Sequence, residues 1–168
     1  MIEAFIESVR ISLMSTTQVV ILRERGGKRR LPIFIGRPEG DAIYTHLNGE
    51  QFPRPMTHDL AANLISQLRV SLRRIVINAL RDGYFYAQVV IAANGREFSF
   101  DARPSDALAL AVRLDSPIYV APEVMDEAGV IPPEFEETPE EEEKGLEAFD
   151  EFISSLDLDD LERKDKDE

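Results

Sequence analysis

The side chains best suited to chemistry stand where a strand-like alternation of polar and apolar residues meets a helical segment that is almost entirely apolar. Residues 98–112 read FSFDARPSDALALAV, so Arg103 and Asp106 lie three positions apart at the mouth of a helix with almost no polar face. Partial burial would make a guanidinium and a carboxylate there unusually effective as charges. Capping explains the same letters, because Pro104 suits the first helical position while Ser105 and Asp106 complement the free amides. Both interpretations stay open.

A second junction, earlier in the chain, is similar to this one. Residues 33–43 read IFIGRPEGDAI and residues 98–108 read FSFDARPSDAL. Both run from a strand pattern through Arg-Pro to an acid, an alanine and an aliphatic residue, with a one-residue difference in spacing. We infer an internal duplication of a β-β-β-α unit, although any strand-to-helix turn favours such letters.

Turn signals locate the strands that would position these junctions. Two-residue hairpin signals stand at Gly26-Gly27, Asp82-Gly83 and Asn94-Gly95, each between β-branched or aromatic runs. The strands they predict lie near 3–12, 17–25, 28–35, 74–81, 84–93 and 96–101. A further short, buried strand is predicted at 116–120.

Helical patterns follow each trio of strands, at 38–48 and 104–115. An additional helix is predicted between the two units at 57–69, with Thr57 as its N-cap. Its apolar stripe consists of Leu60, Ala61, Leu64, Ile65 and Leu68. A helical turn at 123–128 is expected to be capped by Gly129. The fold class is therefore α+β, with mixed or antiparallel sheets packed by helices.

The charge of the chain divides it in two. Of its 168 residues, the segment 131–168 holds four Lys or Arg and 17 Asp or Glu, which accounts for the whole net charge of −13. We expect one globular domain over residues 1–130, and an acidic linker with an amphipathic tail helix over residues 131–168. The apolar residues of that tail helix are Leu146, Phe149, Phe152, Ile153 and Leu156.

Other classes are excluded by what the sequence lacks. It has no cysteine, hence no disulfide framework and no cysteine metal site. Its first residues carry acids where a signal peptide needs bases, and no stretch approaches the roughly 20 apolar residues that span a membrane. These features predict a cytoplasmic protein without a membrane segment.

Four motifs together are similar to those of a known family. They are LPIFIG at 31–36, PRPMTHDL at 53–60, DARPSDALALA at 101–111 and PIYV at 117–120. In this order and spacing, over about residues 1–130, the chain resembles the bifunctional nuclease domain family. The resemblance implies an α+β fold and the ability to degrade both DNA and RNA. The chain differs from the family pattern at Gly40, where alanine is usual, and at residues 44–46, where an aliphatic stretch is usual.

Hydrolysis of a phosphodiester needs charge neutralisation at the phosphoryl oxygens, an activated water and help for the leaving oxygen. Hard divalent cations held by carboxylates supply all three. If the two junctions face each other, their acids could form a site for Mg²⁺ or Mn²⁺. The candidate metal ligands are Glu39, Asp41, Asp101 and Asp106, and Arg37 and Arg103 would bind the scissile phosphate.

His58 is the candidate for proton transfer, since histidine titrates near neutral pH. It stands beside Asp59 at a helix start. The predicted catalytic set is therefore Arg103, Asp106, His58 and Asp59. Structural alternatives stay open for this set: His58 can be a surface residue at a cap, and Glu39 and Asp41 can be acids of a first helical turn.

A basic turn offers a further contact for phosphate. Residues 23–30 read RERGGKRR and concentrate five cations. Lys28, Arg29 and Arg30 are candidates, with Arg37, for phosphate binding. Charged residues near a sheet edge also discourage aggregation, so a structural role explains the same letters.

Two functions from different classes are consistent with these features. The first is a broad-specificity nuclease, assisted by a divalent metal, that hydrolyses phosphodiester bonds in DNA and RNA. The second is a non-catalytic binding or regulatory module with a self-associating surface. A homodimer is expected in either case, because two strand trios expose edges. The tail is expected to dock in cis, over the basic turn, or on a partner protein.

Overall fold

The computed structural model describes residues 1–11 and 17–132. The chain divides into two compact units, Met1–Val130 and Ile131–Glu168. The first unit contains every helix and strand of the described residues. The predicted tail helix, with its apolar residues 146–156, lies outside the described residues.

Seven strands form one mixed sheet in the order β3-β2-β1-β7-β4-β5-β6. The first trio is an antiparallel set whose strands are β1 (Ile2–Ile11), β2 (Thr17–Glu24) and β3 (Arg30–Gly36). The second is an antiparallel set whose strands are β4 (Ser71–Arg81), β5 (Tyr84–Ala93) and β6 (Arg96–Ala102). Between them lies β7 (Ile118–Val120), antiparallel to β1 and parallel to β4. The predicted strands are thus confirmed to within a few residues.

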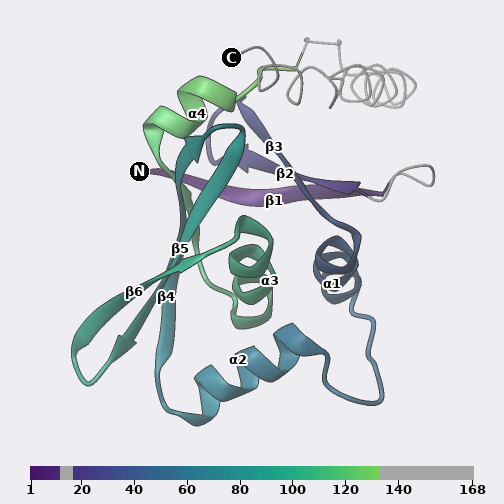
Figure 1. Cartoon of the computed structure of the whole chain (residues 1–168), viewed down its shortest axis with the longest axis vertical. Helices are drawn as coiled ribbons and strands as arrows, with labels where there is room; N and C mark the ends of the chain where they lie inside the picture. Colours follow the sequence, from purple (N-terminus) through teal and green to yellow (C-terminus); the bar gives the residue numbers. More distant parts are fainter. Residues whose placement is uncertain (12–16, 133–168) are drawn as a thin grey trace, which may run out of the picture. The chain divides into compact units, whose positions relative to one another are not determined.

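Four helices accompany the sheet, and the α+β fold class is confirmed. Each trio is followed by a helix, α1 (Arg37–Leu47) after the first and α3 (Pro104–Leu114) after the second. The predicted helix between the units is α2 (Thr57–Gln67), and α4 (Pro122–Ala128) follows β7. Figure 1 shows α3 between the two trios, where it contacts α1, α2, β3, β4 and β5. The duplication of a β-β-β-α unit stays an inference.

The turn residues behave as their types dictate at two of the three hairpins. Both central residues have a positive φ, between 50° and 75°, at Asp82-Gly83 and at Asn94-Gly95. This is the backbone of a two-residue hairpin turn, which favours Asn or Asp followed by Gly. The connection between β2 and β3 is longer than predicted, since β3 begins at Arg30 rather than 28. The side chain of Arg29 turns back there to Glu24, so the ladder does not continue to the glycines.

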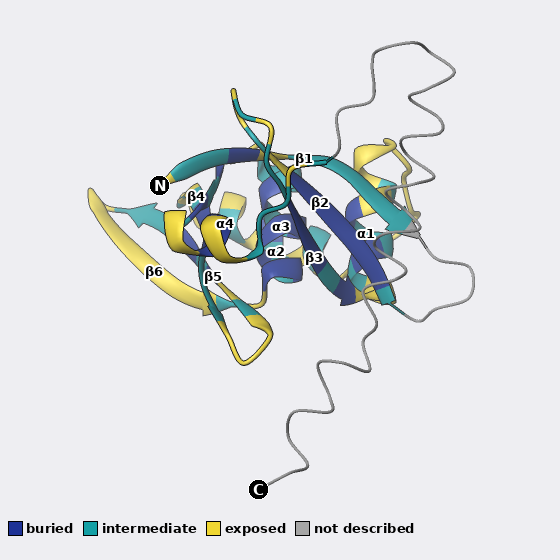
Figure 2. Cartoon of the chain, turned by 90° about the horizontal axis from the view of Figure 1, so that it is seen from above, coloured by how far each residue is buried: buried dark blue, intermediate teal, exposed yellow. Residues whose placement is uncertain are grey.

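Burial differs sharply between strands. Consecutive residues 18–22 of β2 are all buried, because both faces of this strand are covered. Residues 96–101 of β6 are all exposed, and only Ala102 is partly buried. Figure 2 shows this contrast between the blue β2 and the yellow β6. The core lies between the helices α1, α3 and α4 and the strands of the sheet, and Ile33, Ile75 and Leu108 are among its fully buried members.

One of the two predicted helix caps differs in the structure. The N-cap of α2 is Met56 instead of Thr57, and its amide donates a hydrogen bond of 2.8 Å to a carboxylate oxygen of Asp59. Gly129 is the C-cap of α4, as predicted, although its φ of −73° is not left-handed. Within the described residues no helix is long and apolar enough to cross a membrane.

The leucines of the predicted apolar stripe of α2 face solvent instead of the core, whereas its Ala61 and Ile65 are partly buried. Leu60, Leu64 and Leu68 are exposed, and Met56 extends the same row at intervals of four residues. The reason is that α2 turns a different side toward α3, the side that carries His58, Asp59 and the buried Ala62. Periodicity predicted the stripe correctly, but the direction of the stripe depends on these polar contacts.

Candidate nuclease site

Two strand-to-helix junctions and one helix start meet at the candidate site. The residue before α1 is Gly36 and the residue before α3 is Arg103, and their φ and ψ angles are nearly the same, at −66° and 151° and at −67° and 146°. Proline in the first turn of each helix fixes this entry, since it lacks the amide that the helix leaves unpaired. Glu39 and Asp106 then occupy the third position of their helices, where an acid complements the positive helix end.

Arg103 joins the two acids. Its Nε and Nη2 donate hydrogen bonds of 2.8 and 3.1 Å to the two carboxylate oxygens of Asp106. Its Nη1 lies 3.0 Å from a carboxylate oxygen of Glu39. The structure therefore brings together three residues that the sequence placed in one site, from both Arg-Pro junctions. The side chain of Arg103 remains 65% exposed, so its guanidinium is open to a ligand.

His58 completes the cluster from the start of α2. Its Nε2 lies 2.9 Å from Oδ1 of Asp106, and its side chain is 14% exposed. Partial burial alone would raise the pKa of Asp106, but the hydrogen bonds from Arg103 and His58 outweigh it and hold that pKa below its usual value. Asp106 is thus an ionised carboxylate that a histidine and an arginine share.

Asp59 follows His58 in the chain, but its carboxylate binds Arg113, whereas His58 binds Asp106. One of its carboxylate oxygens accepts a hydrogen bond of 2.6 Å from Nε of Arg113, and the other accepts the Met56 amide. The hydrogen bond from Arg113 lowers the pKa of Asp59, and the Met56 amide adds to the effect. The structure places Asp59 beside the cluster, where it ties α2 to α3 and positions His58.

Arg113 was missed by the sequence analysis. Its side chain is only 6% exposed, and it donates to the carbonyl oxygens of Ala42 in α1 and Ala109 in its own helix, each at 3.0 Å. One guanidinium therefore links α1, α2 and α3. A signal was present, because Arg113 is the only charged residue among the apolar residues 107–114.

Asp41 belongs to a separate, partly buried contact. Its Oδ1 accepts a hydrogen bond of 2.7 Å from Nε2 of Gln18, a buried side chain of β2. Gly40 makes this contact possible, since a Cβ at that position would lie 2.7 Å from Cδ of Gln18, closer than real Cβ atoms come. Arg37 lies 3.8 Å from the other oxygen of Asp41 along the same helix. The departure from the family pattern at Gly40 thus has a packing reason.

The remaining candidate residues lie away from Arg103. Asp101 is exposed on β6, opposite Gln88, and its side chain leaves the face opposite to that of its neighbour Ala102, which packs on the core. Within residues 1–11 and 17–132 no three His, Asp or Glu side chains are grouped so as to hold a metal ion. The predicted four-carboxylate set is therefore divided: Glu39 and Asp106 share Arg103, while Asp41 and Asp101 point elsewhere.

The basic turn is largely paired with acids of the chain. Arg29 donates to Glu24 at 2.9 Å and to Asp126 at 2.6 Å, and these bonds raise the pKa of Arg29. Arg30 binds Glu7 at 2.5 and 2.9 Å. Lys28 lies in the same turn, beyond the end of β3 that is far from Arg37, and β3 alone is roughly 20 Å long by the rise of an extended strand. The structure does not bring these cations to the His58 cluster.

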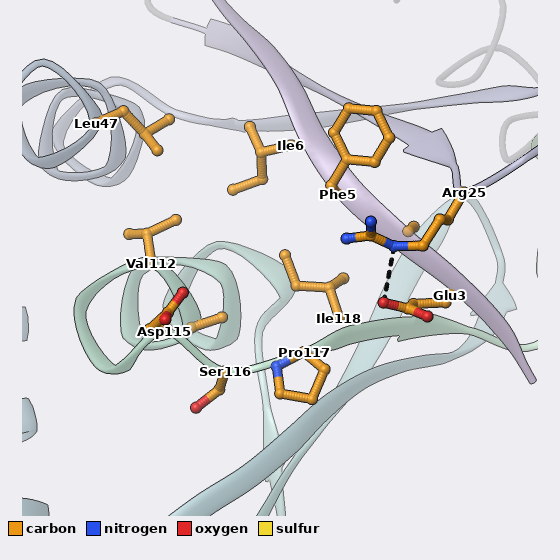
Figure 3. Close-up of a pocket in the computed structure, with 12 residues that line it drawn as sticks. Glu3, Phe5, Ile6, Arg25, Leu47, Val112, Asp115, Ser116, Pro117 and Ile118 are labelled. Atoms are coloured by element: carbon orange, nitrogen blue, oxygen red, sulfur yellow. Dashed lines mark ion pairs between the residues drawn. The ribbon is translucent and has the colours of Figure 1, made fainter.

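A separate hollow of about 400 Å³ lies beside the last turn of α3. Figure 3 shows Leu47, Ile6, Val112 and Phe5 around it, with the ion pair of Arg25 and Glu3, at 2.8 Å, along one side. None of the predicted site residues lines this hollow. The chemistry-bearing cluster is at the opposite end of α3.

Comparisons with known proteins agree with the motifs. The model of the bifunctional nuclease domain matches residues 20–133. An uncharacterized protein of Mycobacterium tuberculosis is 40% identical over 162 residues, which are 95% of this chain and 97% of that protein. Bifunctional nuclease 1 of Oryza sativa subsp. japonica is 26% identical and bifunctional nuclease 2 of Arabidopsis thaliana 25% identical, each over 105 residues. Those residues are 61% of this chain and 32% of each plant protein. The chain belongs to the bifunctional nuclease domain family.

Proposed function

We propose that the chain is a nuclease that hydrolyses phosphodiester bonds of DNA and RNA at the Arg103 junction. The observation that supports this most is the meeting of His58 and Arg103 on the single carboxylate of Asp106. A base oriented by a carboxylate, next to an exposed guanidinium, is the equipment that hydrolysis of a phosphodiester requires. The names of the plant relatives and the family match support the same reaction class.

His58 is proposed to accept the proton of the attacking water. Because Asp106 is ionised and can only accept hydrogen bonds, Nε2 of His58 carries the proton between them, which leaves Nδ1 as the basic nitrogen. Water attacks the phosphorus, Nδ1 takes its proton, and the bond from phosphorus to the leaving oxygen breaks as that oxygen gains a proton from solvent. Asp106 then stabilises the imidazolium.

Arg103 is proposed to bind the scissile phosphate. A guanidinium has five N–H donors. Asp106 and Glu39 use three of them, one on each nitrogen, so one N–H on Nη1 and one on Nη2 remain for phosphoryl oxygens. Donors on two nitrogens of one guanidinium suit the oxygens of a phosphate.

A divalent cation stays part of the proposal. Arg103 carries one positive charge, whereas Glu39 and Asp106 carry two negative ones, so an approaching phosphodiester would meet excess negative charge. Glu39 and Asp106 suit Mg²⁺ or Mn²⁺, since Mg²⁺ commonly uses one or two carboxylates together with water and substrate phosphate. When bound, such a cation neutralises phosphoryl oxygens and makes water more acidic.

The test is a nuclease assay on single-stranded and duplex DNA and on RNA, with and without EDTA. His58→Ala and Asp106→Asn are expected to lower the turnover rate on the order of 10²–10⁴-fold, the usual contribution of general base catalysis. Glu127→Gln, an exposed acid of α4, is the matched control. Activity that survives in both variants would assign the hydrolysis to a contaminant or another site. Activity that survives EDTA would remove the cation from the proposal.

A non-catalytic, self-associating module is the second candidate, and the exposed row on α2 favours it. Met56, Leu60, Leu64 and Leu68 form this row, and the charged or titratable residues of α2, His58 and Asp59, both point toward α3. Because residues 131–168 account for the whole net charge of −13, residues 1–130 carry none, and an uncharged row there is a surface at which two copies can approach. We propose a homodimer here. Leu60→Glu with Leu64→Glu should yield a monomer by light scattering, and an unchanged mass would refute it.

The tail and the location stay predictions. Removal of residues 132–168, which account for the whole net charge of −13, is expected to strengthen binding of DNA or RNA at low salt. Binding that is unchanged by the truncation would leave docking on a partner protein, or a solubilising role, for the tail. The cytoplasmic location is to be checked by fractionation.

A further inference from the structure

The edge strand β6 carries two phenylalanines that the core does not use. Residues 96–101 are exposed, and the rings of Phe98 and Phe100 are 41% and 51% exposed. Every strand other than β6 has at least one buried residue among those described. Large aromatic side chains are normally buried or engaged with a partner, so their position calls for an occupant.

Both rings lie on the face of the sheet where the helices pack. Phe98 is opposite Ile91 and Phe100 is opposite Val89, and both partners belong to or pack against the core. Ala102, on the same side of β6, also packs against the core. The two phenylalanines therefore continue the core-facing row beyond the area that the helices cover.

An arginine extends this row away from the site. The guanidinium of Arg96 lies 5.7 Å from the centroid of the Phe98 ring. Because side chains alternate along a strand, Arg96, Phe98 and Phe100 share one face and are spaced about 7 Å apart. A cation and two aromatic rings in line are the pattern that binds a nucleic-acid strand by stacking and charge.

The row leads directly to the proposed reaction centre. Phe100 is three residues before Arg103, about 10 Å along an extended backbone. Arg103 binds Asp106 and Glu39 at the junction, and His58 binds Asp106 there. A strand of nucleic acid that lies along β6 would thus bring one of its phosphates to the exposed guanidinium.

We propose that β6 binds single-stranded nucleic acid, with two successive unpaired bases stacked on Phe98 and Phe100. The inference rests on the proposed function, since it names the form of substrate delivered to Arg103. A duplex does not fit this surface as well, because the faces of its bases are covered by their neighbours in the stack. The sequence of the bases is not read, since stacking tolerates every base.

The experiment measures binding apart from hydrolysis, by fluorescence anisotropy of a labelled oligodeoxythymidylate and of a duplex of equal length. Phe98→Leu with Phe100→Leu keeps apolar volume but removes both rings. We expect the affinity for the single strand to fall roughly tenfold for each ring lost, and the affinity for the duplex to change less than about twofold. Phe98→Tyr with Phe100→Tyr should restore single-strand binding.

Tyr84→Leu is the matched control, because Tyr84 is a more exposed aromatic at the other end of β5. It should leave single-strand affinity unchanged. Equal losses for Tyr84→Leu and the double variant, or no loss in either, would overturn the inference. A double variant whose mass halves in light scattering while single-strand affinity holds would instead assign β6 to pairing between copies.

The two proposals can fail separately. Hydrolysis that depends on His58 but not on the phenylalanines would overturn the inference and keep the proposed function. Single-strand binding that depends on the rings, in a chain that hydrolyses nothing, would keep the binding surface and overturn the nuclease.

Discussion

The residue before the helix has nearly the same φ and ψ angles in the two Arg-Pro junctions, but the arginine stands at a different position in each. In the second junction Arg103 is itself the residue before the helix, whereas in the first that position is Gly36 and Arg37 is the first residue of α1. Arg37 therefore lies along its own helix, 3.8 Å from Asp41, while Arg103 reaches both Asp106 and Glu39. A shift of one residue decides which arginine joins the two halves.

The two acids that bind Arg103 occupy the same position in their helices, although the sequence similarity of the junctions would not pair them. Sequence similarity pairs Asp41 with Asp106, but Glu39 and Asp106 are the residues at the third position of α1 and α3. Both bind Arg103, and only the second junction has a histidine from α2 beside it. Equivalent helix starts thus become one asymmetric site.

The largest expected effect on the hydrolysis rate is the difference between removing Arg103 and removing Arg37. Arg103→Ala is expected to lower the hydrolysis rate on the order of 10²–10³-fold, the usual loss for one donor to a developing oxyanion. Arg37→Ala should cost less than about tenfold, because its guanidinium is not held at the cluster. Rates of both variants on one substrate check this. Similar losses would mean that the two junctions act as equals.

The next effect concerns the guanidinium that keeps α2 at the second junction. Arg113→Met should destabilise the fold by about 3 kcal/mol, because it leaves Asp59 half-buried without its cation. Urea unfolding measures the change. The variant should also slow hydrolysis by displacing His58, and a stable variant with normal rates would show that Arg113 does not position α2.

A smaller effect tests the packing of the first junction. Gly40→Ala places a Cβ against Gln18 and should cost about 2 kcal/mol, as overpacking of a core does. In a Gln18→Ala background the same change should cost less, since most of the opposing side chain is gone. Urea unfolding of the four chains gives the coupling. Additive costs would mean that Gly40 is required for another reason.

The smallest effect is the pH dependence of the second junction. The pKa of Asp106 is lowered in the folded chain, so the stability it contributes is present above its unfolded pKa, about 3.8, and is lost as the pH falls through the folded pKa. Asp106→Asn should therefore flatten the loss of stability below about pH 4. Thermal unfolding between pH 7 and pH 3 would test it, and parallel curves for both chains would contradict it.

Local signals predicted the fold well because they act over short distances. The Asp-Gly and Asn-Gly turns fix the second trio, and Pro104 with Asp106 fixes the start of α3. What the sequence did not predict depends on residues far apart in the chain. The pair of Arg113 with Asp59 spans 54 positions and that of Gln18 with Asp41 spans 23. Neither periodicity nor composition carries information on such pairs.

The cluster itself was predicted in part, for the same reason. Arg103 with Asp106 is a local ion pair across three positions at the start of α3, whereas His58 with Asp106 crosses 48 positions. Histidine was chosen for its titration range, not its location. The four-carboxylate metal set assumed that facing junctions bring all their acids together, but alternation on β6 directs Asp101 to the other side.

The position of β7 in the chain limits the order in which the strands of the sheet can pair. This strand of three residues separates the two trios and pairs with β1 on one side and β4 on the other, yet it follows both of them in the chain. During synthesis each trio leaves the ribosome before the strand that unites them exists. Hydrogen bonding across the middle of the sheet therefore cannot form before β7 exists, and in a nascent chain halted before residue 118 only helix contacts such as those of α3 can join the two trios.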